Sequence, residues 1–138
     1  MKLPILCLTL SCSTLAWSAT PSSDAAPVAS APLDLAPFAE AVASCRPASH
    51  SGPHPFMKGF TIEHTIRGEV DGACGYTQSM PGGMTMECAL SDAGREGLAE
   101  EFRQQAEGRL SGGTSRQPGW TRECEIVDNA GKRSPMGG

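Results

Sequence analysis

The sequence predicts a small α+β domain in which an antiparallel sheet carries two helices on one face and two disulfides staple the fold. Three observations predict this class. Two segments have apolar residues at helical spacing, several short segments alternate apolar and polar residues, and four cysteines lie in the same region. The sheet is expected to be a three-stranded meander with one further C-terminal strand.

Residues 1–19 have the layout of a secretory signal peptide. Lys2 supplies a positive charge, residues 3–10 form an apolar stretch, and small residues follow. This stretch is far shorter than the ~20 residues that a membrane-spanning helix needs, so no transmembrane segment is expected. The favoured interpretation is export to the periplasm or the medium. The alternative is a lipid anchor at Cys12, which would make the protein an outer-membrane lipoprotein.

The folded domain is expected to span residues 33–127. Residues 20–32 are almost entirely Ala, Pro and Ser, which predicts a disordered spacer. A first helix is predicted over residues 34–45, with Asp34 as its N-cap. Its apolar stripe consists of Phe38, Ala41, Val42 and Cys45. Residues 48–58 contain Gly and Pro and predict a loop.

Alternation of apolar and polar residues predicts three strands, over residues 60–66, 73–80 and 84–90. Residues 81–83, Pro-Gly-Gly, predict a hairpin between the last two. A three-residue turn there sets four pairs opposite each other on the core face: Met80 and Met84, Gln78 and Met86, Tyr76 and Cys88, and Cys74 and Leu90.

A second helix is predicted from the cap residue Ser91 to about residue 107. Its buried stripe is Leu98, Ala99, Phe102 and Ala106, and Glu100 and Glu101 are placed on its solvated face. A last strand is predicted over residues 120–127. Residues 128–138 are expected to be a disordered tail.

Four cysteines remain once the signal peptide is removed: Cys45, Cys74, Cys88 and Cys124. An even number in a small exported domain predicts a disulfide framework, with three possible connectivities. We favour Cys74–Cys88 and Cys45–Cys124, although the hairpin register makes the first pair diagonal and requires a bulge or slip. A redox or zinc site is disfavoured, because no C-x-x-C motif occurs.

The chain has a formal net charge of −4 at pH 7 and no cluster of basic residues. Nucleic acid and anionic membrane surfaces are therefore poor partners. The glycine pairs lie in turns rather than between a strand and a helix, so they do not predict a phosphate-binding loop. No cofactor is predicted.

Imidazole and thioether side chains form the best metal hypothesis. Such ligands suit Cu(I), and the candidates are His50, His54, Met57, Met80, Met84 and Met86. Methionines at alternate strand positions more often pack a core, so we assign no metal site.

His64 is the best candidate for a catalytic base. It lies in phase with the apolar residues Phe60, Ile62 and Ile66. Catalysis would require a hydroxyl, thiol or carboxylate within hydrogen-bond reach of its ring. The preferred interpretation is a histidine at the rim of the sheet, so no catalytic residue is assigned.

The sequence of the predicted hairpin also resembles a hairpin of other proteins. The segment from Cys74 to Cys88 has the pattern C-x-Y-x3-M-P-G-G-x4-C, with Tyr76 near its start. It resembles a hairpin found in uncharacterised small exported bacterial proteins with a four-cysteine framework. The resemblance implies the order of the elements and a periplasmic setting, and it brings no activity.

These observations predict a non-enzymatic exported domain that binds another cell-envelope protein. One concrete version is an inhibitor or immunity protein for a periplasmic enzyme. The alternatives are a periplasmic copper-binding protein that uses the His and Met ligands, and an enzyme with His64 as its base.

Overall fold

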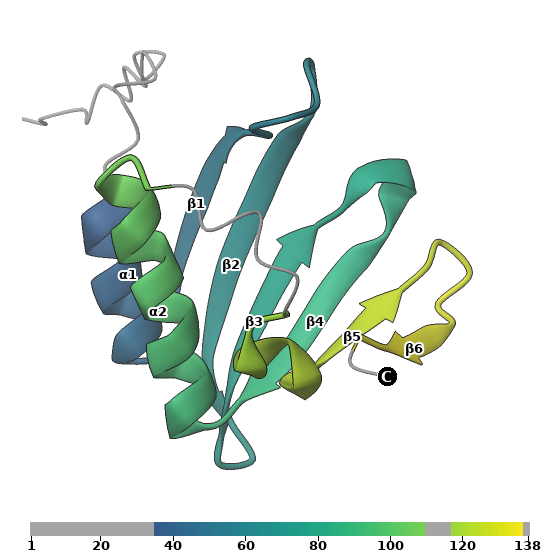
Figure 1. The fold of residues 1–138 in the computed structure, drawn as a ribbon. Helices are drawn as coiled ribbons and strands as arrows, with labels where there is room; N and C mark the ends of the chain where they lie inside the picture. The colour runs from purple at the N-terminus through teal and green to yellow at the C-terminus, as the bar shows by residue number, and fades with distance from the viewer. Residues whose placement is uncertain (1–34, 110–116, 137–138) are drawn as a thin grey trace, which may run out of the picture.

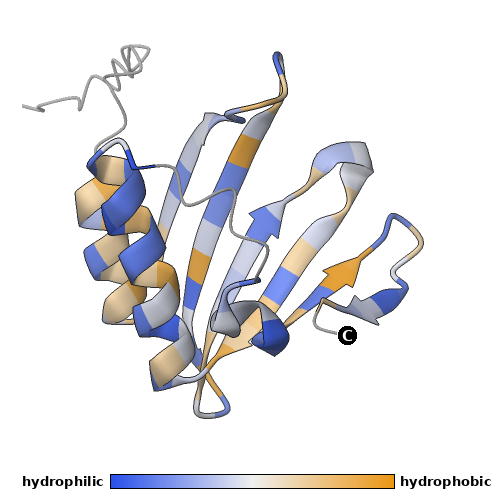
Figure 2. Cartoon of the chain, viewed as in Figure 1, coloured by the Kyte–Doolittle hydropathy of each residue, from blue (hydrophilic) through white to orange (hydrophobic). Residues whose placement is uncertain are grey.

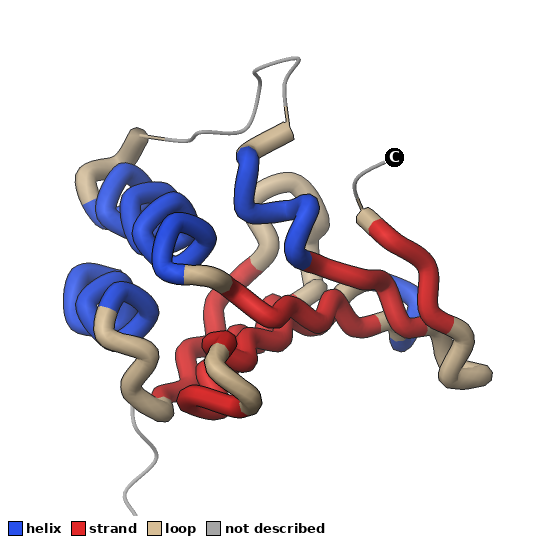
Figure 3. Tube along the Cα trace, turned by 90° about the horizontal axis from the view of Figure 1, so that it is seen from below, coloured by secondary structure: helices blue, strands red, loops and turns tan. Residues whose placement is uncertain are grey.

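A computed structural model describes residues 35–109 and 117–136 of the chain. They form two layers, a sheet and a pair of helices that covers one of its faces (Figures 1 and 3). The six strands are antiparallel and follow one another across the sheet in chain order, β1 to β6. The predicted α+β class is confirmed, with six strands in place of four.

The helices are α1 (Leu35–Ala43) and α2 (Asp92–Ala106), and two short 3-10 turns are η1 (Pro81–Gly83) and η2 (Gly119–Glu123). The strands are β1 (Ala48–Pro53), β2 (Thr61–Val70), β3 (Ala73–Ser79), β4 (Thr85–Leu90), β5 (Cys124–Val127) and β6 (Arg133–Pro135).

Several predictions concern residues outside the described part. They are the signal peptide over residues 1–19, the spacer over residues 20–32, the lipid anchor at Cys12 and the cap at Asp34. Within the described part, neither helix is both long enough and apolar enough to cross a membrane.

The central hairpin and the second helix follow the sequence prediction closely. Hydrophilic and hydrophobic residues alternate along β2 (Figure 2). The β3–β4 register is the predicted one, with Cys74 opposite Leu90 and Tyr76 opposite Cys88. Ser91 caps α2, because its hydroxyl accepts a hydrogen bond from the Gly94 amide at 3.1 Å.

Strand β1 replaces the first part of the loop predicted over residues 48–58, while residues 54–58 belong to no strand. Its sequence, Ala-Ser-His-Ser-Gly-Pro, has few of the residues that favour strands. It pairs with β2 over its whole length, from Ala48 opposite Ile66 to Pro53 opposite Thr61. Proline is tolerated there because β1 is an edge strand, where one backbone amide in two faces away from the sheet.

Strand β6 replaces part of the predicted disordered tail. Asp128 organises the turn before it, because its Oδ1 accepts hydrogen bonds from the amides of Ala130 and Lys132, each at 2.9 Å. Gly131 in this turn has φ +78°, a conformation that glycine adopts without strain.

The last predicted strand is wrong over its first residues, because Gly119–Glu123 forms η2 and β5 begins at Cys124. Glu123 instead reaches the N-terminus of α2. Its carboxylate accepts hydrogen bonds from the Ser91 amide at 2.6 Å and the Ser91 hydroxyl at 2.8 Å. Gly94 permits this approach, since a Cβ at that position would collide with the carboxylate.

Both predicted disulfide pairings are wrong, although all four cysteines are paired as expected. The structure joins Cys45 to Cys74 and Cys88 to Cys124. Cys88 lies directly opposite Cys124 across β4 and β5, so no bulge or slip is needed. Cys45 follows α1 with φ +49° and is joined to the beginning of β3. The first disulfide therefore ties a helix to the sheet.

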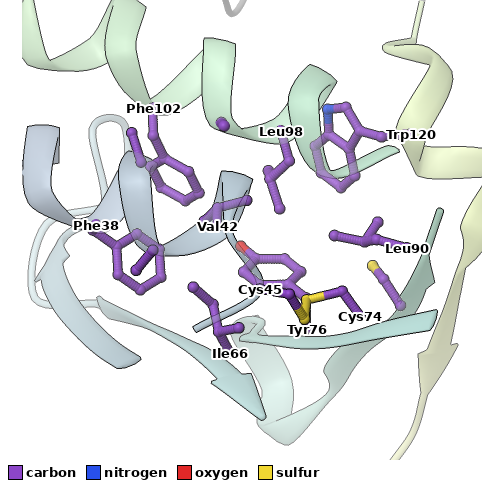
Figure 4. Close-up of a cluster of buried hydrophobic side chains, with 14 of the residues drawn as sticks. Phe38, Val42, Cys45, Ile66, Cys74, Tyr76, Leu90, Leu98, Phe102 and Trp120 are labelled. Atoms are coloured by element: carbon purple, nitrogen blue, oxygen red, sulfur yellow. A yellow bond between two sulfur atoms is a disulfide. The ribbon is translucent and has the colours of Figure 1, made fainter. Parts of the chain in front are cut away.

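The core lies between the sheet and the helices (Figure 4). Tyr76 occupies its middle, with Leu98 and Trp120 on one side and Phe38 and Phe102 on the other. Trp120, the first residue of the predicted last strand, is also part of this core. Ala106 of the predicted buried stripe is not, because it is exposed near the end of α2.

Candidate functional site

Strands β2 and β3 bring a histidine, a tyrosine and a glutamine together beneath the helices. His64 lies opposite Gln78, and Tyr76 is two residues away on the same face of β3. The Tyr76 hydroxyl donates a hydrogen bond to Oε1 of Gln78 at 3.0 Å. Nδ1 of His64 therefore donates to the hydroxyl oxygen, at 2.7 Å. These two hydrogen bonds satisfy polar groups at the border of the core.

Aromatic rings enclose His64. Phe102 of α2 meets it edge-on with ring centroids 5.1 Å apart, and Phe38 of α1 lies 6.0 Å away. His50 is directly opposite in β1, also with ring centroids 6.0 Å apart. The packing of two helices against two strands thus holds the imidazole in one orientation.

The enclosure shifts the acid–base properties of both rings. Burial lowers the pKa of His64 to about 4, and the neighbouring His50 contributes in the same direction. Burial also lowers the pKa of His50. Burial raises the pKa of Tyr76 far above its ordinary value, and the Glu101 carboxylate adds to the rise. Near neutral pH, His64 is unprotonated and Tyr76 is protonated.

His64 has the hydrogen-bond partner that a catalytic base needs, but neither His64 nor Tyr76 has a pKa suited to proton transfer near pH 7. A hydroxyl lies within hydrogen-bond reach of His64, as a catalytic base requires. A base with a pKa of about 4 gains little from accepting a proton near pH 7, and a phenol with a raised pKa is a poor acid. The His64–Tyr76–Gln78 network is therefore best explained as a structural element.

A structural network makes a definite prediction for Tyr76→Phe. The ring and its packing remain, but Nδ1 of His64 and Oε1 of Gln78 lose their shared partner. We expect the free energy of unfolding to fall by about 1–3 kcal/mol, because two hydrogen bonds are lost and each usually contributes about 0.5–1.5 kcal/mol. Urea denaturation followed by circular dichroism measures this change. An unfolding free energy equal to that of the wild type would contradict the assigned role.

Glu101 is a half-buried carboxylate, whereas the sequence pattern places it on the solvated face of α2. Burial raises its pKa, and the Trp120 indole acts in the opposite direction. The indole Nε1 is itself buried and has no hydrogen bond of normal geometry within the described residues. Glu101 lies three residues after the buried Leu98, and this helical spacing beside the buried stripe is the sequence signal that could have identified it.

The six candidate copper ligands are distributed over separate parts of the domain. Met86 is buried in the core, and Met80 packs against the core from the end of β3. His54 directly follows β1, which is three strands from β4, or about 14 Å at the usual strand spacing. Within the described residues, no group of three or more His, Cys, Asp or Glu side chains is arranged to hold a metal ion. Copper binding remains a prediction, which no contact between these side chains in the described part of the chain supports.

The end of the β1–β2 hairpin, residues 54–60, is the most exposed apolar part of the described domain. We call it the hairpin tip, and it projects beyond the neighbouring hairpin (Figure 1). Phe56 is 72% exposed and Met57 is 43% exposed. Nδ1 of His54 accepts hydrogen bonds from the amides of these two residues, at 3.1 and 3.0 Å. A loop prediction for residues 48–58 gave no indication of this organisation.

The outer face of the sheet carries an open groove of ≈ 560 Å³. Three arginines and three glutamates line it: Arg67, Arg122, Arg133, Glu87, Glu123 and Glu125. Arg133 forms ion pairs with Glu87 at 2.9 Å and with Glu125 at 3.2 Å. Because positive and negative side chains balance, the groove favours neither an anion nor a cation.

No family model, curated protein or solved structure matches the chain. Function must therefore be inferred from the geometry of the described residues.

Proposed function

We propose that the protein is an exported, disulfide-stapled domain that binds another protein of the cell envelope and catalyses no reaction. The two disulfides indicate an oxidising, non-cytoplasmic setting. The signal-peptide pattern of residues 1–19 supports the periplasm or the external medium as the destination.

The observation that carries the proposal is that the reactive side chains of the domain serve its fold. The four cysteines form disulfides, and His64 is hydrogen-bonded and enclosed by aromatic rings. His54 uses Nδ1 to hold backbone amides. What such a domain offers to its surroundings is a rigid surface, and rigid surfaces favour binding because little conformational entropy is lost on association.

Crosslinking in intact cells of the source organism tests the proposal. After formaldehyde treatment, the full chain with a C-terminal tag is recovered and its adducts are identified by mass spectrometry. We expect one envelope protein to recur in independent cultures, and purified oxidised domain added to opened cells should compete for it. The reduced and alkylated domain should not compete.

The same material tests export, since the recovered chain is expected to begin at Ala19 or Thr20. Failure to recover a recurrent partner, or equal competition by the reduced and alkylated domain, would contradict the binding proposal. An intact amino terminus in the cytoplasmic fraction would contradict export.

A further inference from the structure

The hairpin tip exposes the aromatic side chain of Phe56 to solvent, whereas folded proteins usually bury phenylalanine. Within the described residues, the exposed large hydrophobic side chains are Phe56, Met57 and Val70. Two of these three are neighbours at the hairpin tip. Burying a phenylalanine side chain stabilises a fold because apolar surface leaves water, so a fold that leaves Phe56 exposed forgoes that stabilisation.

The backbone of the hairpin tip is fixed by hydrogen bonds. The His54 amide donates to the Phe60 carbonyl at 2.8 Å, and the Phe60 amide donates to the Met57 carbonyl at 3.3 Å. Gly59 has φ +80°, as the third residue of a type II turn requires. Nδ1 of His54 accepts from the two amides at the apex.

Side-chain packing fixes the hairpin tip further. The His54 ring lies between two aromatic rings, with centroid distances of 6.2 Å to Phe56 and 5.9 Å to Phe60. Phe56 therefore lies on a hydrogen-bonded turn, with its ring against His54, rather than on a loose loop. A fixed aromatic side chain binds with a small entropic loss, which is the property of a binding anchor.

From these observations we propose that the domain docks through the hairpin tip, inserting Phe56 into an apolar pocket of a protein partner whose rim carries carboxylates. This inference rests on the proposed binding function and names its surface. Lys58, exposed beside Phe56 and Met57, supplies the cation that acidic groups at the rim would meet. A central aromatic anchor with a charged neighbour is a common arrangement in protein interfaces.

Two other occupants fit less well. A bilayer surface calls for a larger apolar face or several basic residues, whereas the hairpin tip has one lysine and the chain has a net charge of −4. A second copy would have to supply an apolar pocket, but the large groove of the described domain is lined mostly by charged side chains.

Photo-crosslinking in intact cells tests the proposal. The full chain carries p-benzoylphenylalanine in place of Phe56 or, as a control, of Val70. Val70 is 56% exposed, but the β2–β3 turn beside it lies at the opposite end of the sheet. We expect a dominant adduct with an envelope protein from position 56 and none from position 70.

The role of His54 is tested in the same strain. His54→Ala removes the acceptor, and we expect the adduct yield to fall about tenfold as the apex loses its fixed shape. His54→Asn is the matched control, because Asn accepts from the same two amides in an Asx turn and should keep most of the yield. Equal thermal unfolding of the two variants shows that the fold is not the cause.

The outcomes separate this inference from the function on which it rests. If formaldehyde still captures the partner but position 56 yields no adduct, the docking surface is elsewhere and the binding function stands. An adduct with lipid or with a second copy would overturn the protein-pocket proposal. So would equal yields from positions 56 and 70, or equal yields from the two His54 variants. If neither method captures a partner, both proposals fail.

Discussion

Replacing all four cysteines of the domain with alanine is expected to leave it largely unfolded at 25 °C. The disulfides close loops with sequence separations of 29 and 36 residues. The chain-entropy relation assigns each loop about 4 kcal/mol of stabilisation. Domains of this size have free energies of unfolding of about 5–15 kcal/mol, so the loss of both disulfides removes most or all of that free energy. Far-UV circular dichroism during urea denaturation measures the effect.

Variants that lack one disulfide provide the control. Cys45→Ala with Cys74→Ala, and Cys88→Ala with Cys124→Ala, should each lose about 4 kcal/mol. The two losses should be additive, because the closed loops share no residue. Loops nested as in the sequence prediction would not be independent in this way. Losses below about 1 kcal/mol for either variant would contradict the assigned contribution.

Peptide mapping of the oxidised protein distinguishes the two connectivities directly. Cleavage after Glu87 separates Cys74 from Cys88, whereas trypsin leaves them on one peptide because no Lys or Arg lies between them. Digestion at both glutamate and basic residues should therefore link the Cys45 peptide to the Cys74 peptide. A link between the peptides of Cys74 and Cys88 would contradict the structure.

The folded domain is expected to lose about 3 kcal/mol of stability between pH 6.5 and pH 4 because of His64. The pKa of His64 is about 4 in the folded state, against an ordinary value of 6.5 in the unfolded chain. As the pH falls through this window, the unfolded state binds a proton that the folded state excludes. The stability that unprotonated His64 contributes to the folded state is therefore fully present above pH 6.5. It is lost progressively below pH 6.5 and changes little below pH 4.

The difference between wild type and His64→Phe isolates this effect. Other groups near His64 also titrate: the pKa of His50 is lowered, whereas burial raises the pKa of Glu101, which contributes in the opposite direction. Urea denaturation at several pH values should show a steeper decline for the wild type than for the variant. Parallel curves between pH 6.5 and pH 4 would contradict the low pKa of His64.

The best sequence predictions were those that depend on local patterns. Pro81, Gly82 and Gly83 determine the hairpin turn, and the alternation on either side then leaves only one register that puts the large apolar residues on one face. The second helix was equally predictable, because Ser91 and the stripe at Leu98 and Phe102 carry local signals for a cap and a buried face.

The disulfide connectivity could not be obtained in this way. Cys74 and Cys88 are close in the chain and in neighbouring strands, which favours their pairing on sequence grounds. They are diagonal in the register, however, and Cys88 has a directly opposite partner only because β5 lies beside β4. Strand β5 follows α2 and the segment after α2 in the chain, so its position beside β4 depends on contacts between distant parts of the chain.

The environment of His64 likewise depends on a detail that the strand patterns do not contain. Asp71 and Gly72 form the tight β2–β3 turn, with φ +53° and +79°. If the register set by that turn continued along both strands, Ile66 would lie opposite residue 77. Ile66 and Tyr76 would then lie on opposite faces of the sheet. A bulge between Ile66 and Gly68 shifts the register and returns both to the core, and with it Tyr76 comes within reach of His64.

By itself, the sequence determined the fold class, the central hairpin, the cap and length of α2, and the pairing of all four domain cysteines. The hairpin, the cap and the length of α2 follow from interactions between residues that are near one another in the chain or share one strand face, whereas the pairing of the cysteines was predicted from their even number. The tertiary structure alone decided the edge strands β1 and β6, the disulfide partners, the acid–base state of His64 and the exposed position of Phe56. Each of these depends on which element packs beside another, because weakly patterned segments take their conformation, and buried groups their pKa, from neighbours far away in the chain.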